Sequence, residues 1–210
     1  MERERKILVT GFEPWGKWER NPSGEIAEAL SGTMVSGHSV VSTTVPVVHG
    51  EDIAGVAPLI DAHRPAAVVS LGLGGGTALR VERVAVNLRV LDSDGGSEDH
   101  EVVQGGPAAH FSTLPVRGMV RTIREAGVPA QLSYSAGTFL CNHLMYSILH
   151  HLSQQGLDMP AGFVHIPAMP EQVVDNGQPS MALEAMERGI VAGLRAVVDQ
   201  LAKPTTAAAV

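Results

Sequence analysis

The chain has 210 residues, of which 44% are hydrophobic, and a formal net charge of −7 at pH 7. This length and apolar content predict a single α/β domain over residues 1–210 with a sizeable core. The acidic charge and the lack of a basic cluster argue against binding to nucleic acids or anionic membranes. No run approaches the roughly 18 apolar residues of a membrane span, so we expect no membrane partner.

Short apolar runs alternate with helical patterns along the chain. Six runs predict strands at 7–12, 39–47, 66–71, 81–88, 130–134 and 162–166. Five periodic segments predict helices at 22–31, 50–63, 115–126, 140–154 and 179–202, with Pro58 an unfavourable residue inside the second. The alternation predicts a three-layer α/β/α fold, in which helices cover both faces of a twisted mixed sheet. We expect the glycine-rich loop 92–114 to border the functional site and the tail 203–210 to be frayed.

The start of the chain and the cysteine content bear on the compartment. The segment Met1-Glu-Arg-Glu-Arg-Lys6 is not followed by a long apolar stretch, so we expect no signal peptide. Cys141 is the only cysteine, so no intrachain disulfide can form, which is typical of a reducing cytoplasm. Both observations predict a cytoplasmic location.

Cys141 also lies where a helix is expected to begin. The predicted strand 130–134 leads into the small-residue bend Ser135-Ala-Gly-Thr138, and an apolar helical pattern follows. In a first helical turn, free backbone N–H groups and the helix dipole favour the thiolate, which is the nucleophilic form of cysteine. The alternative is that the thiol packs in the core, as buried cysteines commonly do.

A nucleophilic cysteine needs a base, and the chain has nine histidines. His143 would point to nearly the opposite side of the helix from Cys141, and His150 and His151 fall in its last turns. His165 ends a predicted strand before a proline-rich turn, at the sheet edge where α/β enzymes place their chemistry. It could equally be a hydrogen-bonded core residue. No metal-ligand spacing such as His-Glu-x-x-His occurs, so we expect no metal.

Glu82 is the candidate for a group that orients the base. If 81–88 is a strand, its period of two places Glu82 on the same buried face as Arg80, Val84 and Val86. A carboxylate on a buried face is costly unless it is paired. Glu82 could pair with an arginine for structural reasons, or it could hold a histidine in one tautomer. The periodicity does not choose between these partners.

The glycine-rich run Gly72-Leu-Gly-Gly-Gly-Thr77 invites comparison with a phosphate-binding loop. It lacks the last glycine of the dinucleotide fingerprint, and a strand rather than a helix is expected after it. No Gly-Lys-Ser/Thr sequence occurs anywhere in the chain. We therefore expect no nucleotide and no other cofactor.

Five segments of the chain carry recognisable motifs. They are Val9-Thr-Gly-Phe-Glu-Pro-Trp-Gly16 with Asn21-Pro-Ser23, Glu82-Arg-Val-Ala-Val-Asn87, Gln104-Gly-Gly-Pro-Ala-Ala109, Ser135-Ala-Gly-Thr-Phe-Leu-Cys-Asn-His143, and Phe163-Val-His-Ile-Pro167 with Pro170-Glu-Gln172. In this order, over residues 6–172, they resemble the pyroglutamyl peptidase I family, also called pyrrolidone-carboxylate peptidases. Five separate motifs in the same order make a chance resemblance improbable.

The resemblance implies a cytosolic cysteine exopeptidase (an omega peptidase) and joins the three residues into one site. It assigns the nucleophile to Cys141, the base to His165 and the orienting carboxylate to Glu82. The implied reaction is removal of an N-terminal pyroglutamyl residue from peptides through a thioester acyl-enzyme, without a cofactor. The family is also commonly homotetrameric.

The resemblance further implies a substrate pocket lined by Phe12, Trp15, Asn21 and Leu140, which would hold a small flat lactam. Two of these residues also have structural explanations. Phe12 could pack in the core, and Asn21 precedes Pro22 as a helix N-cap would. Trp15 is harder to explain as a core residue, because it lies in a polar loop.

Three positions depart from the family pattern. Trp15 stands where the family usually has phenylalanine, and Thr77 follows the glycines where the family has an arginine, a charge that Arg80 could replace. The segment 90–96 stands in place of an Arg-(Ile/Leu)-Pro-Asp stretch. Two alternatives therefore stay open, namely a thiol-dependent amidase or esterase for another small acyl group and a non-catalytic binder of pyroglutamyl peptides.

Overall fold

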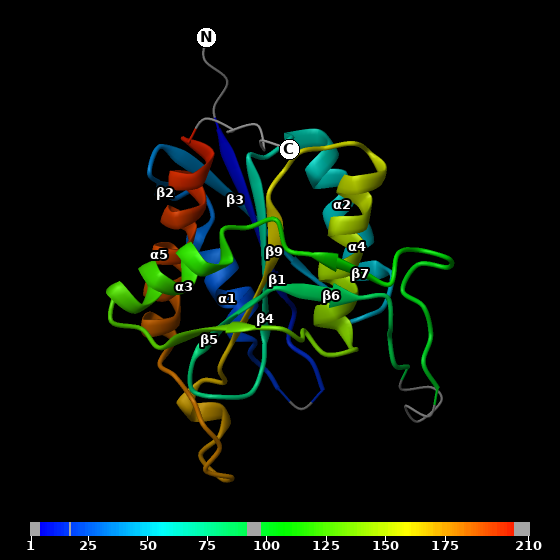
Figure 1. The fold of residues 1–210 in the computed structure, drawn as a ribbon. Helices are drawn as coiled ribbons and strands as arrows, with labels where there is room; N and C mark the ends of the chain where they lie inside the picture. The colour runs from blue at the N-terminus through cyan, green and yellow to red at the C-terminus, as the bar shows by residue number, and fades with distance from the viewer. Residues whose placement is uncertain (1–4, 17, 92–97, 204–210) are drawn as a thin grey trace.

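A computed structural model describes residues 5–16, 18–91 and 98–203 (Figure 1). Its strands are β1 (Lys6–Phe12), β2 (Met34–Val35), β3 (His38–Val45), β4 (Ala67–Leu73), β5 (Leu79–Glu82), β6 (Val84–Val86), β7 (Ala109–Phe111), β8 (Ala130–Ser133) and β9 (Ala161–Ile166). Its helices are α1 (Pro22–Leu30), α2 (Glu51–His63), α3 (Val116–Glu125), α4 (Leu140–Gln154) and α5 (Leu183–Leu201), with a short 3₁₀ turn, η2 (Pro170–Gln172). Five predicted helices and five of the six predicted strands thus appear close to their expected bounds.

Seven strands form one mixed sheet in the order β2-β3-β1-β4-β9-β5-β8. The four central strands β3, β1, β4 and β9 are parallel, so their carboxyl ends meet at one edge of the sheet. Strand β5 is antiparallel to β9, and β8 is parallel to β5. The common edge of the four parallel strands is where an α/β fold offers a site.

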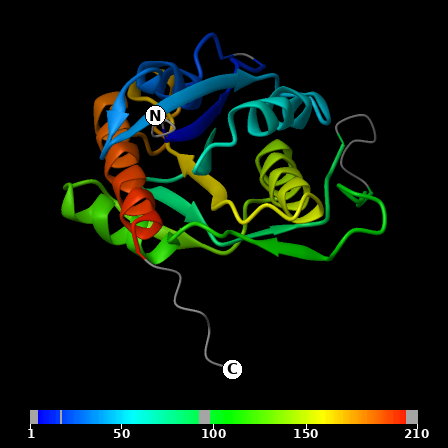
Figure 2. The same ribbon diagram turned by 90° about the horizontal axis from the view of Figure 1, so that it is seen from above.

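Helices cover both faces of this sheet, as the view from above shows (Figure 2). Alternate strand residues face opposite layers. In β1, Ile7 and Val9 join the cluster that packs against α1, α3 and α5, whereas Leu8 joins the cluster that packs against α2 and α4. The predicted three-layer α/β/α fold is confirmed. The α2/α4 face carries the site described below.

The prediction of one strand over 81–88 was wrong. The chain divides it into β5, which belongs to the main sheet, and β6, which pairs with β7 in a separate antiparallel sheet. Arg83 lies at the break, where its backbone N–H donates to Ser133 and its guanidinium donates to the carbonyl of Ser112. The period of two therefore applies to Glu82 and Arg80 but not beyond, and Val84 and Val86 belong to the other sheet.

One other prediction differs from the structure, and two concern residues that the structure describes only in part or not at all. The last helix begins at Leu183 rather than 179, because Ser180 and Met181 pair with Ala168 instead of entering the helix. The loop 92–114 contains the short strand β7, and its part 92–97, like the tail 204–210, lies outside the described residues. Within the described ranges, no helix is both long enough and apolar enough to cross a bilayer.

Candidate active site

His165 lies at the carboxyl end of β9, on the sheet face that α4 covers. The alternation along β9 explains this direction, because Val164 and Ile166 pack into the opposite cluster while Phe163 packs toward α4. The imidazole is only 6% exposed and lies beside the ring of Phe163, with 5.0 Å between ring centroids. Its Nδ1 lies 2.8 Å from Oε1 of Glu82.

Glu82 ends β5, the neighbouring strand, and is fully buried. Leu79 and Val81 pack into the opposite cluster, so the alternation turns Glu82 toward α4 and His165. An ionised carboxylate only accepts hydrogen bonds, so it holds the His165 proton on Nδ1 and leaves Nε2 for another partner. Of the two partners considered from the sequence, Glu82 has both, because Nε of Arg80 lies 3.8 Å from the same oxygen.

Cys141 is the second residue of α4 and so lies in the first helical turn, as predicted; its side chain is half-buried. Its neighbour Asn142 anchors that turn to β6. The Asn142 side chain accepts from the N–H of Val86 at 2.9 Å and donates to the carbonyls of Val86 and Leu88, also at 2.9 Å. A side-chain amide thus continues the strand's hydrogen bonding and holds the start of α4 in place. No sequence pattern signalled this contact.

The charges around His165 favour its protonated form. Burial alone would lower the pKa of His165 below its ordinary value of 6.5. Its charge and hydrogen-bond interactions with the Cys141 thiolate, and then with the Glu82 carboxylate, outweigh burial and raise the pKa of His165 to about 9. Cys141, His165 and Glu82 are therefore linked as one chain of interacting groups.

Two glycines, Gly72 in β4 and Gly74 just after it, provide the space that this arrangement needs. A Cβ atom on Gly72 would lie 2.6 Å from the Phe163 ring and 2.9 Å from Sγ of Cys141. A Cβ atom on Gly74 would lie 2.8 Å from the imidazole of His165. The glycine-rich run, which resembles a phosphate loop in sequence, is thus explained by the close approach of the thiol and the imidazole to the strand.

Replacing Gly72 by alanine is expected to lower kcat/KM at least about tenfold, because the added methyl group displaces Sγ of Cys141 from its place. The free energy of unfolding should also fall, by about 1–3 kcal/mol, since the buried Phe163 ring must shift. Steady-state kinetics and urea unfolding check both effects. Gly75→Ala is the matched control, because a Cβ atom there meets nothing within 4 Å. Equal activity of the two variants would contradict this explanation.

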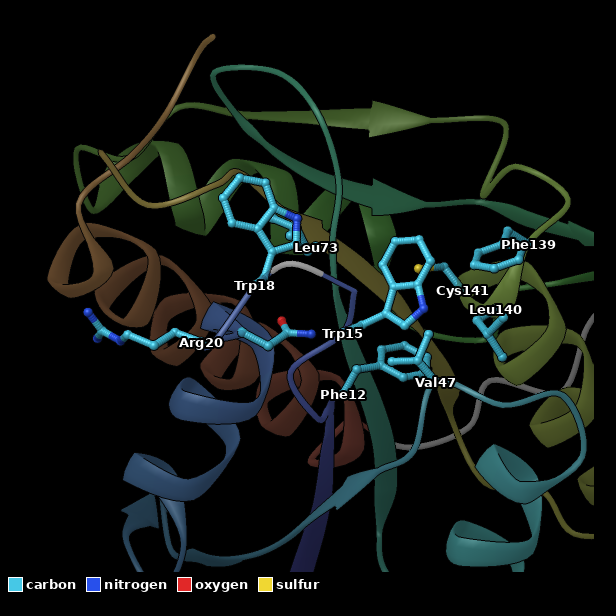
Figure 3. Close-up of a pocket in the computed structure, with 10 residues that line it drawn as sticks. Phe12, Trp15, Trp18, Arg20, Val47, Leu73, Phe139, Leu140 and Cys141 are labelled. Atoms are coloured by element: carbon cyan, nitrogen blue, oxygen red, sulfur yellow. The ribbon is translucent and has the colours of Figure 1, made fainter. Parts of the chain in front are cut away.

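A pocket with a volume of about 130 Å³ opens beside Cys141 (Figure 3). Its walls come from the end of β1, the loop before α1, the loop after β3, the end of β4 and the start of α4. The structure brings all four residues expected in a pocket, and Cys141, to this one place. The ten residues that line it are Phe12, Trp15, Trp18, Arg20, Asn21, Val47, Leu73, Phe139, Leu140 and Cys141.

The structural explanations for Phe12 and Asn21 also hold. Phe12 is 3% exposed and belongs to the α2/α4 core cluster. Asn21 caps α1, accepting from the backbone and hydroxyl of Ser23, and its amide donates to the carbonyl of Glu13. Trp15 differs, because it is 49% exposed and its ring lies 5.8 Å from the ring of Phe139, another lining residue.

Sequence reasoning missed several lining residues. Phe139 directly precedes Leu140 and Cys141, so its place in the same motif was an available signal. Leu73 follows Gly72 at the end of β4 and was passed over with the glycine run. Val47 lies in a loop after β3, and its position gives no signal in the sequence because only the tertiary fold brings it to α4.

The other histidines of α4 have partners elsewhere. His143 packs against α2, where its Nδ1 lies 2.7 Å from Oδ2 of the buried Asp52. His150 lies 3.2 Å from His110 of β7. Neither histidine is among the residues that line the pocket. In the described part of the chain, no group of three or more His, Cys, Asp or Glu residues comes together that could hold a metal ion.

Comparison with known proteins agrees with this geometry. The pyroglutamyl peptidase family profile matches residues 5–200. The pyrrolidone-carboxylate peptidase of Cupriavidus necator is 47% identical over 201 residues, which cover 92% of this chain and 91% of that protein. The pyrrolidone-carboxylate peptidase of Escherichia fergusonii is 45% identical over 192 residues, 89% of each chain. The crystal structure of pyroglutamyl peptidase I from Bacillus amyloliquefaciens superposes with a TM-score of 0.89 at 34% identity, covering 94% of this chain and 98% of that one. The chain belongs to the pyroglutamyl peptidase family.

Proposed function

We propose that this chain hydrolyses the bond after an N-terminal pyroglutamyl residue of peptides, with Cys141 as nucleophile, His165 as acid and base, and Glu82 as orienting carboxylate. The observation that carries the assignment is the link from Glu82 through His165 to Cys141 at the wall of an apolar pocket. Family membership supports the reaction. Membership of this family makes the enzyme a cysteine peptidase of the hydrolase class.

The reaction proceeds in two acyl-transfer steps. The Cys141 thiolate attacks the acyl carbonyl carbon of the pyroglutamyl group, which forms the bond to the next residue, and not the lactam carbonyl. The His165 imidazolium gives its Nε2 proton to the leaving amine nitrogen as that C–N bond breaks. A pyroglutamyl thioester remains on the sulfur. His165, now neutral, takes a proton from water, whose oxygen attacks the thioester. Pyroglutamate leaves, and the thiolate and imidazolium are restored.

The start of α4 also suits the charge that develops on the substrate. The N-cap residue Phe139 makes no side-chain hydrogen bond to the first turn. We infer that the backbone N–H of Cys141 donates to the oxyanion of the tetrahedral intermediate, where the helix dipole also favours negative charge.

The pocket lining fits a lactam better than a free amino terminus. Its residues are mostly apolar, and none of the ten is acidic, so nothing there pairs with an ammonium group. Arg20, its one cation, is bound by Glu25 and Glu171. We infer that the exposed ring of Trp15 and the ring of Phe139 contact the flat pyroglutamyl ring, with Phe12, Asn21 and Leu140 completing the pocket.

The activity is expected to fall above about pH 9. His165 must carry a proton to protonate the leaving amine, and its pKa is raised to about 9. Because the pKa is raised, the protonated form persists through neutral pH and is lost only as the pH rises through this value. A profile of kcat/KM from pH 6 to 10.5 tests this, and an alkaline limb near the ordinary pKa of histidine would contradict it.

The direct test of the activity is fluorophore release from a pyroglutamyl amide by the purified protein, beside a matched prolyl amide. Turnover of the pyroglutamyl amide alone is the expected result, because the prolyl ring carries a charged amine in place of the lactam. A panel of other small acyl amides and esters tests the alternative specificity. Turnover of one of those in place of the pyroglutamyl substrate would overturn the proposal.

Assembly and location remain predictions. A homotetramer is expected from the resemblance, and a cytoplasmic location from the resemblance and the single cysteine. Light scattering at micromolar concentration checks the first, and fractionation of cells that express the protein checks the second.

A further inference from the structure

Arg80 lies directly beside the proposed catalytic groups. It is the register partner of His165 in the antiparallel pairing of β5 with β9. Residues directly opposite each other in such a pair project to the same face. Its Nε lies 3.8 Å from Oε1 of Glu82, the oxygen that also accepts from Nδ1 of His165. One carboxylate oxygen therefore has the imidazole on one side and the guanidinium on another.

The guanidinium is held in this position by the glycine-rich run. Its Nη1 donates to the carbonyl of Gly75 at 2.6 Å. A Cβ atom on Gly74 would lie 2.6 Å from Nη2 of Arg80 and 2.8 Å from Cδ2 of His165, so both side chains pack against the same glycine. The guanidinium of Arg80 and the imidazole of His165 thus lie side by side against Gly74.

The buried carboxylate of Glu82 needs a positive charge close to it. Glu82 is fully buried, and its Oε2 has no hydrogen-bond partner among the described residues. Burying an ionised carboxylate with so few donors is costly, and the loss of charge would end its ability to orient an imidazole. Within the described ranges, Arg80 is the one arginine or lysine that forms an ion pair with it.

We propose that Arg80 is a positioning residue of the triad, which holds the Glu82 carboxylate toward His165 and limits how tightly His165 holds its proton. The proposal rests on the proposed function. A fixed cation beside an imidazolium opposes its charge, while the same cation shares the carboxylate that favours it. A general acid that holds its proton too tightly transfers it slowly, so this balance affects the rate.

Few other groups can set the charge of His165. Next to the imidazole, the end of β4 and the residues after it place Gly72 and Gly74, α4 contributes a thiol, and β9 itself contributes Phe163. The charged or titratable groups facing the imidazole in the described structure are Arg80, Glu82 and Cys141. Removing the Arg80 guanidinium therefore removes one of the three charged or titratable groups that face the His165 imidazole.

The test compares Arg80→Met, which removes the charge but keeps an unbranched side chain, with Arg80→Lys, which keeps the charge. Arg121→Met on α3 is the matched control, because it removes one positive charge from a side chain that is 72% exposed and forms an ion pair with Glu125 along its helix. For each protein, kcat/KM is measured against pH, and the imidazole of His165 is titrated by NMR with ¹³C-labelled histidine.

Arg80→Met is expected to lower kcat/KM about tenfold at neutral pH and to move the alkaline limb and the His165 titration to higher pH. Arg80→Lys should recover most of the rate and return both midpoints toward the wild type, and Arg121→Met should change neither. If Arg80→Met does not fold, as judged by circular dichroism, Arg80→Gln replaces it.

Unchanged midpoints in the neutral variant, or equal shifts in the lysine and methionine variants, would overturn the proposal. The NMR titration needs no substrate, so the two proposals can fail separately. A wild type that does not release pyroglutamate refutes the proposed function. A titration midpoint of His165 that stays the same when the Arg80 guanidinium is removed refutes the role of this arginine.

Discussion

Replacing Cys141 by serine is expected to lower kcat/KM for a pyroglutamyl amide by at least about 1,000-fold. A hydroxyl group is far less acidic than a thiol, so neither the first turn of α4 nor His165 can keep it ionised at neutral pH. The exchange of sulfur for oxygen changes little volume at a half-buried position, so the fold should persist. Steady-state kinetics with a fluorogenic pyroglutamyl amide measure the loss.

Two controls make this result interpretable. Circular dichroism and the urea midpoint of Cys141→Ser should match the wild type, which separates a lost nucleophile from a lost fold. An uncharged alkylating reagent should inactivate the wild type and leave no label on the variant, because Cys141 is the only thiol in the chain. Near-normal turnover by Cys141→Ser would show that the proposed mechanism is wrong.

Replacing Glu82 by glutamine should lower kcat/KM by roughly 100-fold or more, but by less than the cysteine change. Glutamine keeps the volume of this fully buried side chain and removes its charge. The amide no longer fixes the proton of neutral His165 on Nδ1. After the imidazolium has given up its proton, part of the population therefore carries the remaining proton on Nε2 and cannot take one from water. Sulfur itself is untouched, which is why the loss is smaller.

The readout for this variant is kcat/KM together with the His165 NMR titration. Losing the carboxylate removes one of the groups that raise the pKa of His165, so the titration should move to lower pH. Glu125→Gln, an exposed change of the same kind on α3, is the matched control and should behave as the wild type. Full activity in Glu82→Gln would exclude the orienting role.

Local pattern predicted the layers, and the period of two placed Arg80 and Glu82 on one face of a strand, where both lie in the structure. The pattern did not predict that His165, from a different strand, faces the same way and contacts Glu82. The two-residue period failed to predict the fold where one strand ends and the chain pairs with a different strand. Strand β6 leaves the main sheet because it pairs with β7, a three-residue strand too short to leave a periodic signal.

The site was predicted less completely than the fold. Residue patterns marked Cys141, Glu82 and His165 separately, and only the family resemblance joined them. The sequence argued against a phosphate loop at the glycine-rich run but gave no other role to Gly72 and Gly74, which leave space for Sγ and an imidazole from distant segments. The contacts of Asn142 with β6 are long-range hydrogen bonds, which sequence periodicity does not encode.

The central claim is that the pyroglutamyl group is carried on the sulfur of Cys141. Its most direct test is acid quenching of the enzyme during turnover of an activated pyroglutamyl ester, followed by peptide mass spectrometry. We expect the mass of one pyroglutamyl group on the peptide that contains Cys141, in a linkage cleaved by hydroxylamine as a thioester is. Turnover with that peptide unmodified, or with the acyl group on another residue, would contradict the account.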